Sequence, residues 1–251
     1  FRPGVMPSLD YAWERVHRDW PHLIYASVSG FGHSGPYAPR PAYDIIVQAM
    51  GGIMSLTGHP GDPPTRVGTS IGDIAAGMFT AIGVTSALYH RAQTGEATQI
   101  DVAMLDCQVA MLENAIARYA STGVVPGPLG SRHPSITPFE AFATAEGHLV
   151  LAAGNDILFR ELCTVIGRAE LADDPRFASG DLRTQHHDEM KALIEKALSV
   201  APADVWLRAF EDSGIPCGPI QNVAQVLDDP QVAARNMSVS ADDPVAGTLR
   251  M

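Results

Sequence analysis

The sequence predicts an α/β protein with two domains, and three observations lead to this fold class. Residues 22–29 form a continuous apolar and β-branched run that ends at a glycine, which is typical of a strand buried in a parallel sheet. Strand and helix patterns then alternate up to about residue 121. Four prolines and three glycines lie in residues 122–138, where we expect a linker, and a unit with a hairpin and helices follows.

Local sequence patterns predict each secondary-structure element in the first 50 residues. Residues 9–20 are amphipathic and predict a helix. Residues 30–41 contain three glycines and three prolines, so we expect a loop there, and loops at strand ends often bind ligands. A helix is expected over residues 41–50, with Pro41 in its first turn.

The longest helix is expected over residues 71–94. It is apolar on nearly every side, which predicts that it is buried, and Gly95 follows it as a C-terminal cap. A strand over residues 98–104 and a helix over residues 105–119 complete the first domain.

The second domain is expected to hold a small antiparallel sheet with helices. Residues 139–153 predict a hairpin that turns at residues 145–148, and helical patterns follow over residues 156–166, 181–199 and 202–213. The pair His186–His187 lies among charged residues, so we expect both side chains to be solvated. From residue 221 onward we expect one short helix and a polar ending without a strand.

Composition excludes several classes of function. With 28 acidic and 17 basic side chains and a net charge of −11, the average surface would repel nucleic acids and anionic membranes. No apolar run approaches the about 20 residues that cross a bilayer. Three widely spaced cysteines, none in a C-x-x-C pair, indicate a reducing compartment, so we expect a cytoplasmic protein in which Cys107 and Cys163 are buried packing residues.

Common catalytic and metal-binding motifs are missing from the sequence. The nine histidines form no H-x-x-x-H pair, and neither G-x-S-x-G, G-x-G-x-x-G nor a P-loop occurs. We therefore expect no bound metal and no support for a hydrolase or a nucleotide-phosphate site of the usual kinds.

Asp73 is the carboxylate with the most promising position. It follows Gly72 at the start of the long apolar helix, where free N–H groups and the helix dipole favour an ionised carboxylate. Small neighbours leave room for a bulky ligand, so Asp73 is a candidate nucleophile in an enclosed site. From the residues alone, a helix-capping role is the more frequent alternative.

Nine segments, taken in order and spacing, carry a resemblance to a known family. They are Phe1–Gly4 (FRPG), Leu23–Gly32 (LIYASVSGFG), Ala42–Asp44 (AYD), Val67–Asp73 (VGTSIGD), His90–Gly95 (HRAQTG), Asp101–Asp106 (DVAMLD), Gly130–Ser135 (GSRHPS), Gly154–Asn155 and Gly214–Pro219 (GIPCGP). The chain resembles the family III CoA-transferases, the group of formyl-CoA transferase, the CaiB/BaiF proteins and the α-methylacyl-CoA racemases.

The resemblance implies a domain organisation. Residues 1–121 would be the C-terminal part of a Rossmann-like large domain that binds CoA and carries the catalytic aspartate, with its N-terminal half missing. Residues 122–138 would be the linker, residues 139–220 a small α+β domain, and residues 221–251 a truncated return segment. The family also implies an interlocked homodimer.

The resemblance further implies an acyl-CoA:carboxylate CoA-transferase with Asp73 as nucleophile. Acyl-CoA and a carboxylic acid would be its substrates, with CoA as a substrate and no permanently bound cofactor. Tyr43 and Asp44 would line the active site. The residues that would contact CoA are Phe1, Arg2, Arg40, Pro41, Ala42 and Tyr43.

Two alternatives remain open. A 2-methylacyl-CoA racemase of the same group would carry a histidine where this chain has Tyr43, and a tyrosine hydroxyl exchanges protons poorly near neutral pH. A non-catalytic fragment that keeps the fold is the other alternative. The chain also departs from the family by having Ser8 in place of an arginine that contacts a CoA phosphate, and residues 127–133 in place of a tetraglycine loop.

Overall fold

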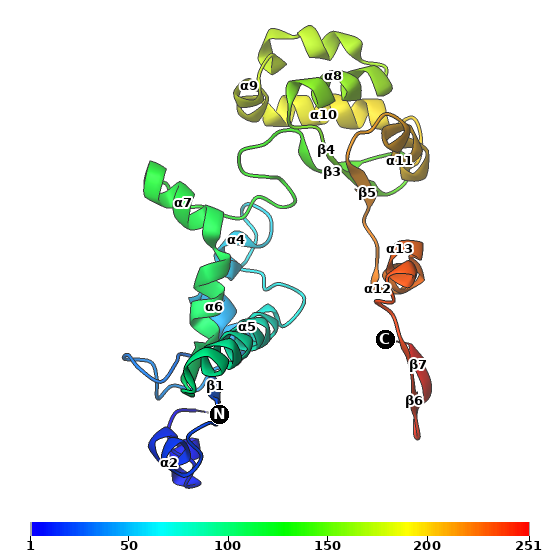
Figure 1. Ribbon diagram of the computed structural model, residues 1–251. Coiled ribbons are helices and arrows are strands. Elements are labelled where there is room, and N and C mark those ends of the chain that lie inside the picture. Colours follow the sequence, from blue (N-terminus) through cyan, green and yellow to red (C-terminus); the bar gives the residue numbers. More distant parts are fainter. Residues whose placement is uncertain (1, 251) are drawn as a thin grey trace. The chain divides into compact units, whose positions relative to one another are not determined.

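The computed structural model describes residues 2–250, which fold as two units (Figure 1). The first unit extends to Gly130 and the second begins at Ser131. This division falls within the stretch 122–138 for which a linker was expected.

A two-stranded parallel sheet organises the first unit. Strand β1 (Tyr25–Ser29) pairs with β2 (Gln99–Ala103) in a register that places Tyr25 opposite Gln99. The chain segment between these parallel strands contains three helices, α3 (Asp44–Met50), α4 (Ile53–Leu56) and α5 (Ile71–Thr94). Both predicted strands of this unit are therefore confirmed.

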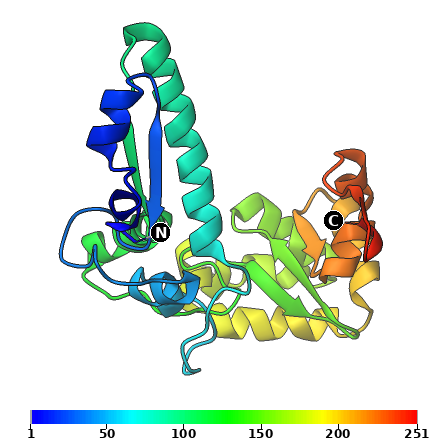
Figure 2. The same ribbon diagram turned by 90° about the horizontal axis from the view of Figure 1, so that it is seen from below.

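Helix α5 lies along β1 and β2 (Figure 2). It ends as predicted, since Gly95 adopts a φ of 80° and its N–H binds the carbonyl of Arg91. The prediction that α5 is buried was wrong. Only Gly72, Ala75, Ala76 and Ala87 are buried in α5, and the strands and neighbouring helices that pack against it leave most of its other residues exposed.

The apolar composition of α5 meets the requirements for a membrane-spanning helix. With a mean hydropathy of 1.5 over its best window, α5 is long and apolar enough to cross a bilayer, contrary to the expectation from the sequence. Its buried alanines pack instead with Phe31, Val47 and Val102 in the core of the first unit.

Several helices of the first unit differ in extent from the sequence predictions. The segment 9–20 yields only α2 (Trp13–Asp19), because Asp10 takes a φ of 69° and ends the short preceding helix α1 (Val5–Ser8). Helix α3 starts at Asp44, three residues later than Pro41. The helix expected over 105–119 is divided at Leu112 into α6 (Met104–Met111) and α7 (Glu113–Thr122).

The second unit contains the predicted small antiparallel sheet. Its strands β3 (Phe139–Ala143), β4 (His148–Ala152) and β5 (Cys217–Pro219) pair in that order. The expected hairpin turn is confirmed at Gly147, which has a φ of 80°. Four α-helices accompany the sheet: α8 (Asp156–Val165), α9 (Gly180–Gln185), α10 (His187–Leu198) and α11 (Ala203–Asp212).

The core of the second unit is apolar, and the charged side chains of Glu140 and Arg183 are buried beside it. Phe142, Leu149, Phe159 and Met190 are among its fully buried side chains, and Cys163 lies in the same core as predicted. The prediction of a solvated His187 was wrong.

His187 is buried because its Nε2 contacts a carboxylate oxygen of Glu140 from β3. Lys191 Nζ binds the other oxygen of Glu140 at 2.5 Å. The helical pattern over 181–199 accordingly divides at His186, and α10 begins at the residue that Glu140 holds.

The C-terminal part of this unit holds more structure than expected. It forms helices α12 (Val223–Asp228) and α13 (Pro230–Ala234), followed by a hairpin of β6 (Ser240–Asp243) and β7 (Gly247–Arg250). A capping box between Asn222 and Gln225 starts α12. The hairpin turn closes because Asp243 accepts the N–H groups of Val245 and Ala246, so the predicted strandless ending was wrong.

Candidate active site

A cavity of about 550 Å³ lies at the carboxyl end of β1. Ligands of open parallel sheets bind beyond the carboxyl ends of the strands, so this is the edge where a site is expected. The lining residues come from the N-terminal segment, the end of β1, the loop that follows it and the residue after β2: Arg2, Pro3, Val28, Ser29, Gly30, Arg40, Pro41, Ala42, Tyr43 and Met104.

Five of the six residues expected to contact CoA line this one cavity. They are Arg2, Arg40, Pro41, Ala42 and Tyr43, and Phe1 lies outside the described residues. Tyr43 is 80% exposed, so its side chain is open to solvent beside the cavity. The structure thus brings together segments that are about 40 residues apart in the sequence.

Gly30 allows the two walls of the cavity to meet. A Cβ atom at this position would lie 2.3 Å from the Cβ of Ala42, a distance that folded proteins do not tolerate. The Gly30 carbonyl also accepts the N–H of Leu105, which ties the end of β1 to the start of α6. The glycine after β1 therefore has a packing role in addition to ending the strand.

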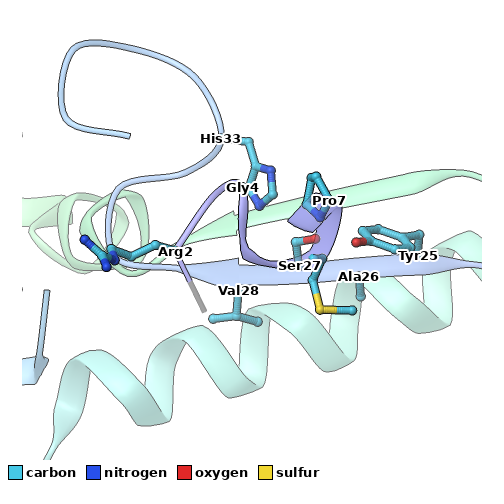
Figure 3. Close-up of a pocket in the computed structure, with 9 residues that line it drawn as sticks. Arg2, Gly4, Pro7, Tyr25, Ala26, Ser27, Val28 and His33 are labelled. Atoms are coloured by element: carbon cyan, nitrogen blue, oxygen red, sulfur yellow. The ribbon is translucent and has the colours of Figure 1, made fainter. Parts of the chain in front are cut away.

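A second cavity of about 270 Å³ adjoins the first along β1 (Figure 3). The two cavities share Arg2 and Val28, and the second also involves Tyr25, Ser27 and His33. In Figure 3 the Arg2 side chain extends away from His33 and beyond Val28. Its guanidinium group therefore points to the strand end at which the larger cavity lies.

Two arginines, Arg2 and Arg40, line the larger cavity. Within residues 2–250, the arginines of the first unit that pair with carboxylates are Arg15, Arg18 and Arg66. Neither Arg2 nor Arg40 is among them, so both guanidinium groups keep donors for a ligand. Guanidinium groups suit phosphate groups, because their N–H donors match phosphate oxygens in a bidentate geometry.

Asp44 follows Tyr43 and begins α3, but its carboxylate points into the protein. It is 7% exposed. Oδ1 accepts the N–H of Gly72 at 2.9 Å and Oδ2 accepts Gln48 Nε2 at 2.7 Å, while Arg66 lies 3.8 Å from Oδ2. The carboxylate thus binds one of the free N–H groups in the first turn of α5 and joins α3 to that turn.

Gln48 is a residue of this network that sequence reasoning missed. It is fully buried, and its amide binds Asp44, the carbonyl of Thr69 at 3.3 Å and the N–H of Val67 at 2.9 Å. These bonds hold the segment that leads into α5. The available signal was its position one helical turn after Asp44, which places both side chains on one face of α3.

The start of α5 is packed too closely for any residue larger than glycine. A Cβ atom on Gly72 would lie 2.8 Å from Val47, 3.0 Å from Gln108 and 3.1 Å from Asp44. Gln108 is fully buried, and both polar atoms of its amide lack a hydrogen-bond partner among the described residues. The backbone before Asp73 is therefore held on three sides.

Asp73 lies in the first turn of α5 and is exposed. It is not among the residues that line the larger cavity. The enclosed surroundings expected for a nucleophilic carboxylate are absent around Asp73 within residues 2–250. Asp73 is linked to the cavity by neighbouring residues. Tyr43 lines the cavity, Asp44 follows Tyr43 in the sequence, and Asp44 accepts a hydrogen bond from Gly72, the residue before Asp73.

Comparison with known proteins places this site in context. The family model described as CoA-transferase family III matches residues 1–251. An acetyl-CoA:oxalate CoA-transferase from Acetobacter aceti is 48% identical over 242 residues, which are 96% of this chain and 62% of the relative. A succinate–glutarate CoA-transferase from Agrobacterium fabrum is 41% identical over 94% of this chain and 58% of the relative.

Solved structures show the same fold. A CAIB/BAIF family protein from Brucella suis has a TM-score of 0.83 with 36% sequence identity, over 99% of this chain and 68% of that protein. A protein from M. tuberculosis has a TM-score of 0.89 with 29% identity, over 100% of this chain and 67% of that protein. The predicted α/β fold class is confirmed, and the chain spans about three fifths of the length of the curated relatives it matches.

Proposed function

Because the chain belongs to CoA-transferase family III, we propose that it moves CoA from an acyl-CoA thioester to a carboxylic acid. The observation that carries this proposal is the cavity at the carboxyl end of β1, which joins Arg2 and Arg40 in one site. Two unpaired guanidinium groups in a chain of net charge −11 fit a ligand with several phosphates, and CoA is such a ligand.

Asp73 is the nucleophile in this proposal. One of its carboxylate oxygens attacks the thioester carbonyl, the carbon–sulfur bond breaks, and CoA leaves as a thiolate with an acyl-aspartyl anhydride remaining. The thiolate then attacks the Asp73 carbonyl of the anhydride, which releases the donor carboxylate and forms an aspartyl-CoA thioester. The acceptor carboxylate next attacks the thioester carbonyl of aspartyl-CoA, which expels CoA as a thiolate and forms an anhydride between the acceptor and Asp73. The thiolate then attacks the acceptor carbonyl of this anhydride, which forms the new acyl-CoA and releases Asp73 as a carboxylate.

Every intermediate of this sequence contains a carbonyl group that is as activated as the substrate thioester, first in the anhydride and then in the aspartyl-CoA thioester. An anhydride and a thioester both react readily with water, so the reaction requires that Asp73 be shielded while they exist.

Tyr43 and Asp44 take different roles in the proposal. Tyr43 lines the cavity with an exposed hydroxyl that can donate a hydrogen bond to a substrate carboxylate. Asp44 has both oxygens engaged in hydrogen bonds, so its geometry favours positioning the start of α5 over direct contact with substrate.

The acceptor is proposed to be a small dicarboxylic acid. The relatives reported above are named for oxalate and for succinate and glutarate, all of which carry two carboxyl groups. The protein is further proposed to act in the cytoplasm. It is also proposed to be a homodimer, and sedimentation of the purified chain would test this oligomeric state.

Trapping of the covalent intermediate tests the proposal. After incubation with acetyl-CoA or succinyl-CoA, hydroxylamine should convert Asp73 to a hydroxamate that peptide mass spectrometry detects, and Asp73→Asn should abolish both the adduct and CoA transfer to oxalate or glutarate. The matched control is Asp62→Asn, an exposed aspartate in the loop before α5. An active protein with unmodified Asp73 would refute the assignment, and an inactive protein that still binds CoA would favour the non-catalytic alternative.

A further inference from the structure

Arg40 lies against two aromatic rings of the loop that follows β1. Its guanidinium carbon is 4.6 Å from the ring centre of Tyr37 and 5.5 Å from that of Phe31. The two rings meet edge to face, with centres 5.7 Å apart and planes at 67°. The three side chains therefore form one stack, which we name the Arg40 stack.

The stack is anchored in the core at one end and open at the other. Phe31 is buried and packs with Val47 in the core of the first unit, whereas Tyr37 and Arg40 are exposed. Backbone hydrogen bonds shape the loop between them, from Ala38 N–H to the Gly35 carbonyl and from Arg40 N–H to the Tyr37 carbonyl. Tyr37 is thus fixed by Phe31 and by the turn that carries Arg40.

Stacking changes what Arg40 can do for a ligand. A guanidinium group on an aromatic ring keeps its N–H donors free at its edge, and the attraction to the ring limits the conformations of a long side chain. A side chain that is ordered before binding loses less entropy when it binds. Arg40 lines the larger cavity and has no ion pair within residues 2–250, so its donors remain for a ligand in that cavity.

The geometry points to Tyr37 as a positioning residue that holds Arg40 for a phosphate group of CoA. The inference rests on the proposed function, since it assumes that CoA occupies the cavity. Tyr37 itself acts through Arg40 and is not among the residues that line the cavity.

Calorimetric titration of the purified chain with CoA and with pantetheine, which lacks the phosphates, tests the inference. Removing a cation–π contact of an exposed pair corresponds to a change in Kd of about two- to fivefold. Tyr37→Leu should therefore weaken CoA binding by about that factor and leave pantetheine binding unchanged. Tyr37→Phe keeps the ring and should restore the CoA affinity.

A double-mutant cycle separates positioning from a general structural effect. In an Arg40→Ala background, Tyr37→Leu should cause no further loss of CoA affinity, because its effect passes through Arg40. Tyr89→Leu on α5 removes an exposed tyrosine that does not line the cavity and serves as the control.

The possible outcomes are distinguishable. If the unmodified chain binds no CoA, the proposed function fails and this inference fails with it. Only the inference is overturned if the unmodified chain binds CoA and the Tyr37→Leu variant binds it equally well. The same holds if Tyr37→Leu weakens pantetheine binding as much as CoA binding, or if it lowers CoA affinity further in the Arg40→Ala background.

Discussion

Replacement of Asp44 tests whether the hydrogen bonds at the start of α5 hold that helix in place. Asp44→Ala removes the acceptors of Gly72 N–H and Gln48 Nε2. A hydrogen bond to a charged group contributes about 1.5–3 kcal/mol, and the Gln48 amide keeps Thr69 as a second acceptor. The ion pair with Arg66 adds little, because that side chain is half exposed and 3.8 Å away.

The expected loss for Asp44→Ala is therefore about 2–4 kcal/mol in the free energy of opening around the first turn of α5. Asp44→Asn should lose about half as much, because one oxygen still accepts a hydrogen bond while the amide group faces the other donor. Asp62→Ala, an exposed aspartate in the loop before α5, should change stability by less than about 0.5 kcal/mol.

Native-state hydrogen exchange of peptides that cover residues 67–75 measures this opening in the first unit alone. A loss of 2–4 kcal/mol corresponds to about 30- to 900-fold faster exchange. An increase below about threefold in Asp44→Ala, or an equal increase in Asp62→Ala, would refute the role assigned to Asp44.

Two further predictions concern the second unit. Arg183, which is 1% exposed, binds the carbonyls of Thr137, Phe177 and Gly154 and the carboxylate of Asp156. Arg183→Ala should therefore lower the free energy of unfolding of this unit by about 3–5 kcal/mol, and Arg183→Lys should not restore it. Urea unfolding followed by Trp206 fluorescence measures this loss in a background where the other two tryptophans, Trp13 and Trp20, are replaced by phenylalanine. A loss below about 1 kcal/mol would contradict this. The Arg176 side chain holds the pKa of Asp174 at about 2, below its ordinary 3.8, so the stability that this pair contributes is present above pH 3.8 and is lost as the pH falls through 2. Arg176→Ala should shift the carboxyl titration of Asp174 upward by NMR, and an unchanged midpoint would show that Arg176 is not the cause.

Local patterns allowed much of the fold to be predicted. The apolar run that ends at Gly30 gave β1, and the glycine at position 95 gave the end of α5, because strands and helix caps depend on residues that are adjacent in the sequence. The hairpin turn at Gly147 follows the same logic. The arginines of the cavity were located through the family resemblance, and the structure shows that both line the same cavity.

Contacts between distant segments account for what the sequence did not reveal. His187 is buried because of Glu140, which lies 47 residues earlier on β3, and no local pattern indicates that partner. The bond between Asp44 and Gly72 joins residues 28 apart in the sequence. The burial of α5 was overestimated because composition shows that a helix is apolar but not how much of it the neighbouring elements cover.

In the proposed mechanism, Asp44 and Asp73 have different roles: Asp44 fixes the backbone at the start of α5, and Asp73 attacks the substrate. A carboxylate that attacks a carbonyl must have a free oxygen within reach of the substrate, and one that fixes the backbone must keep its oxygens bonded. Asp44 is buried, and its two oxygens accept hydrogen bonds from Gly72 N–H and Gln48 Nε2. Asp73 is exposed and follows directly after the N–H group that Asp44 holds. In the proposed mechanism the nucleophilic step at this end of α5 therefore falls to Asp73, and we expect the position of Asp73 to depend on Asp44.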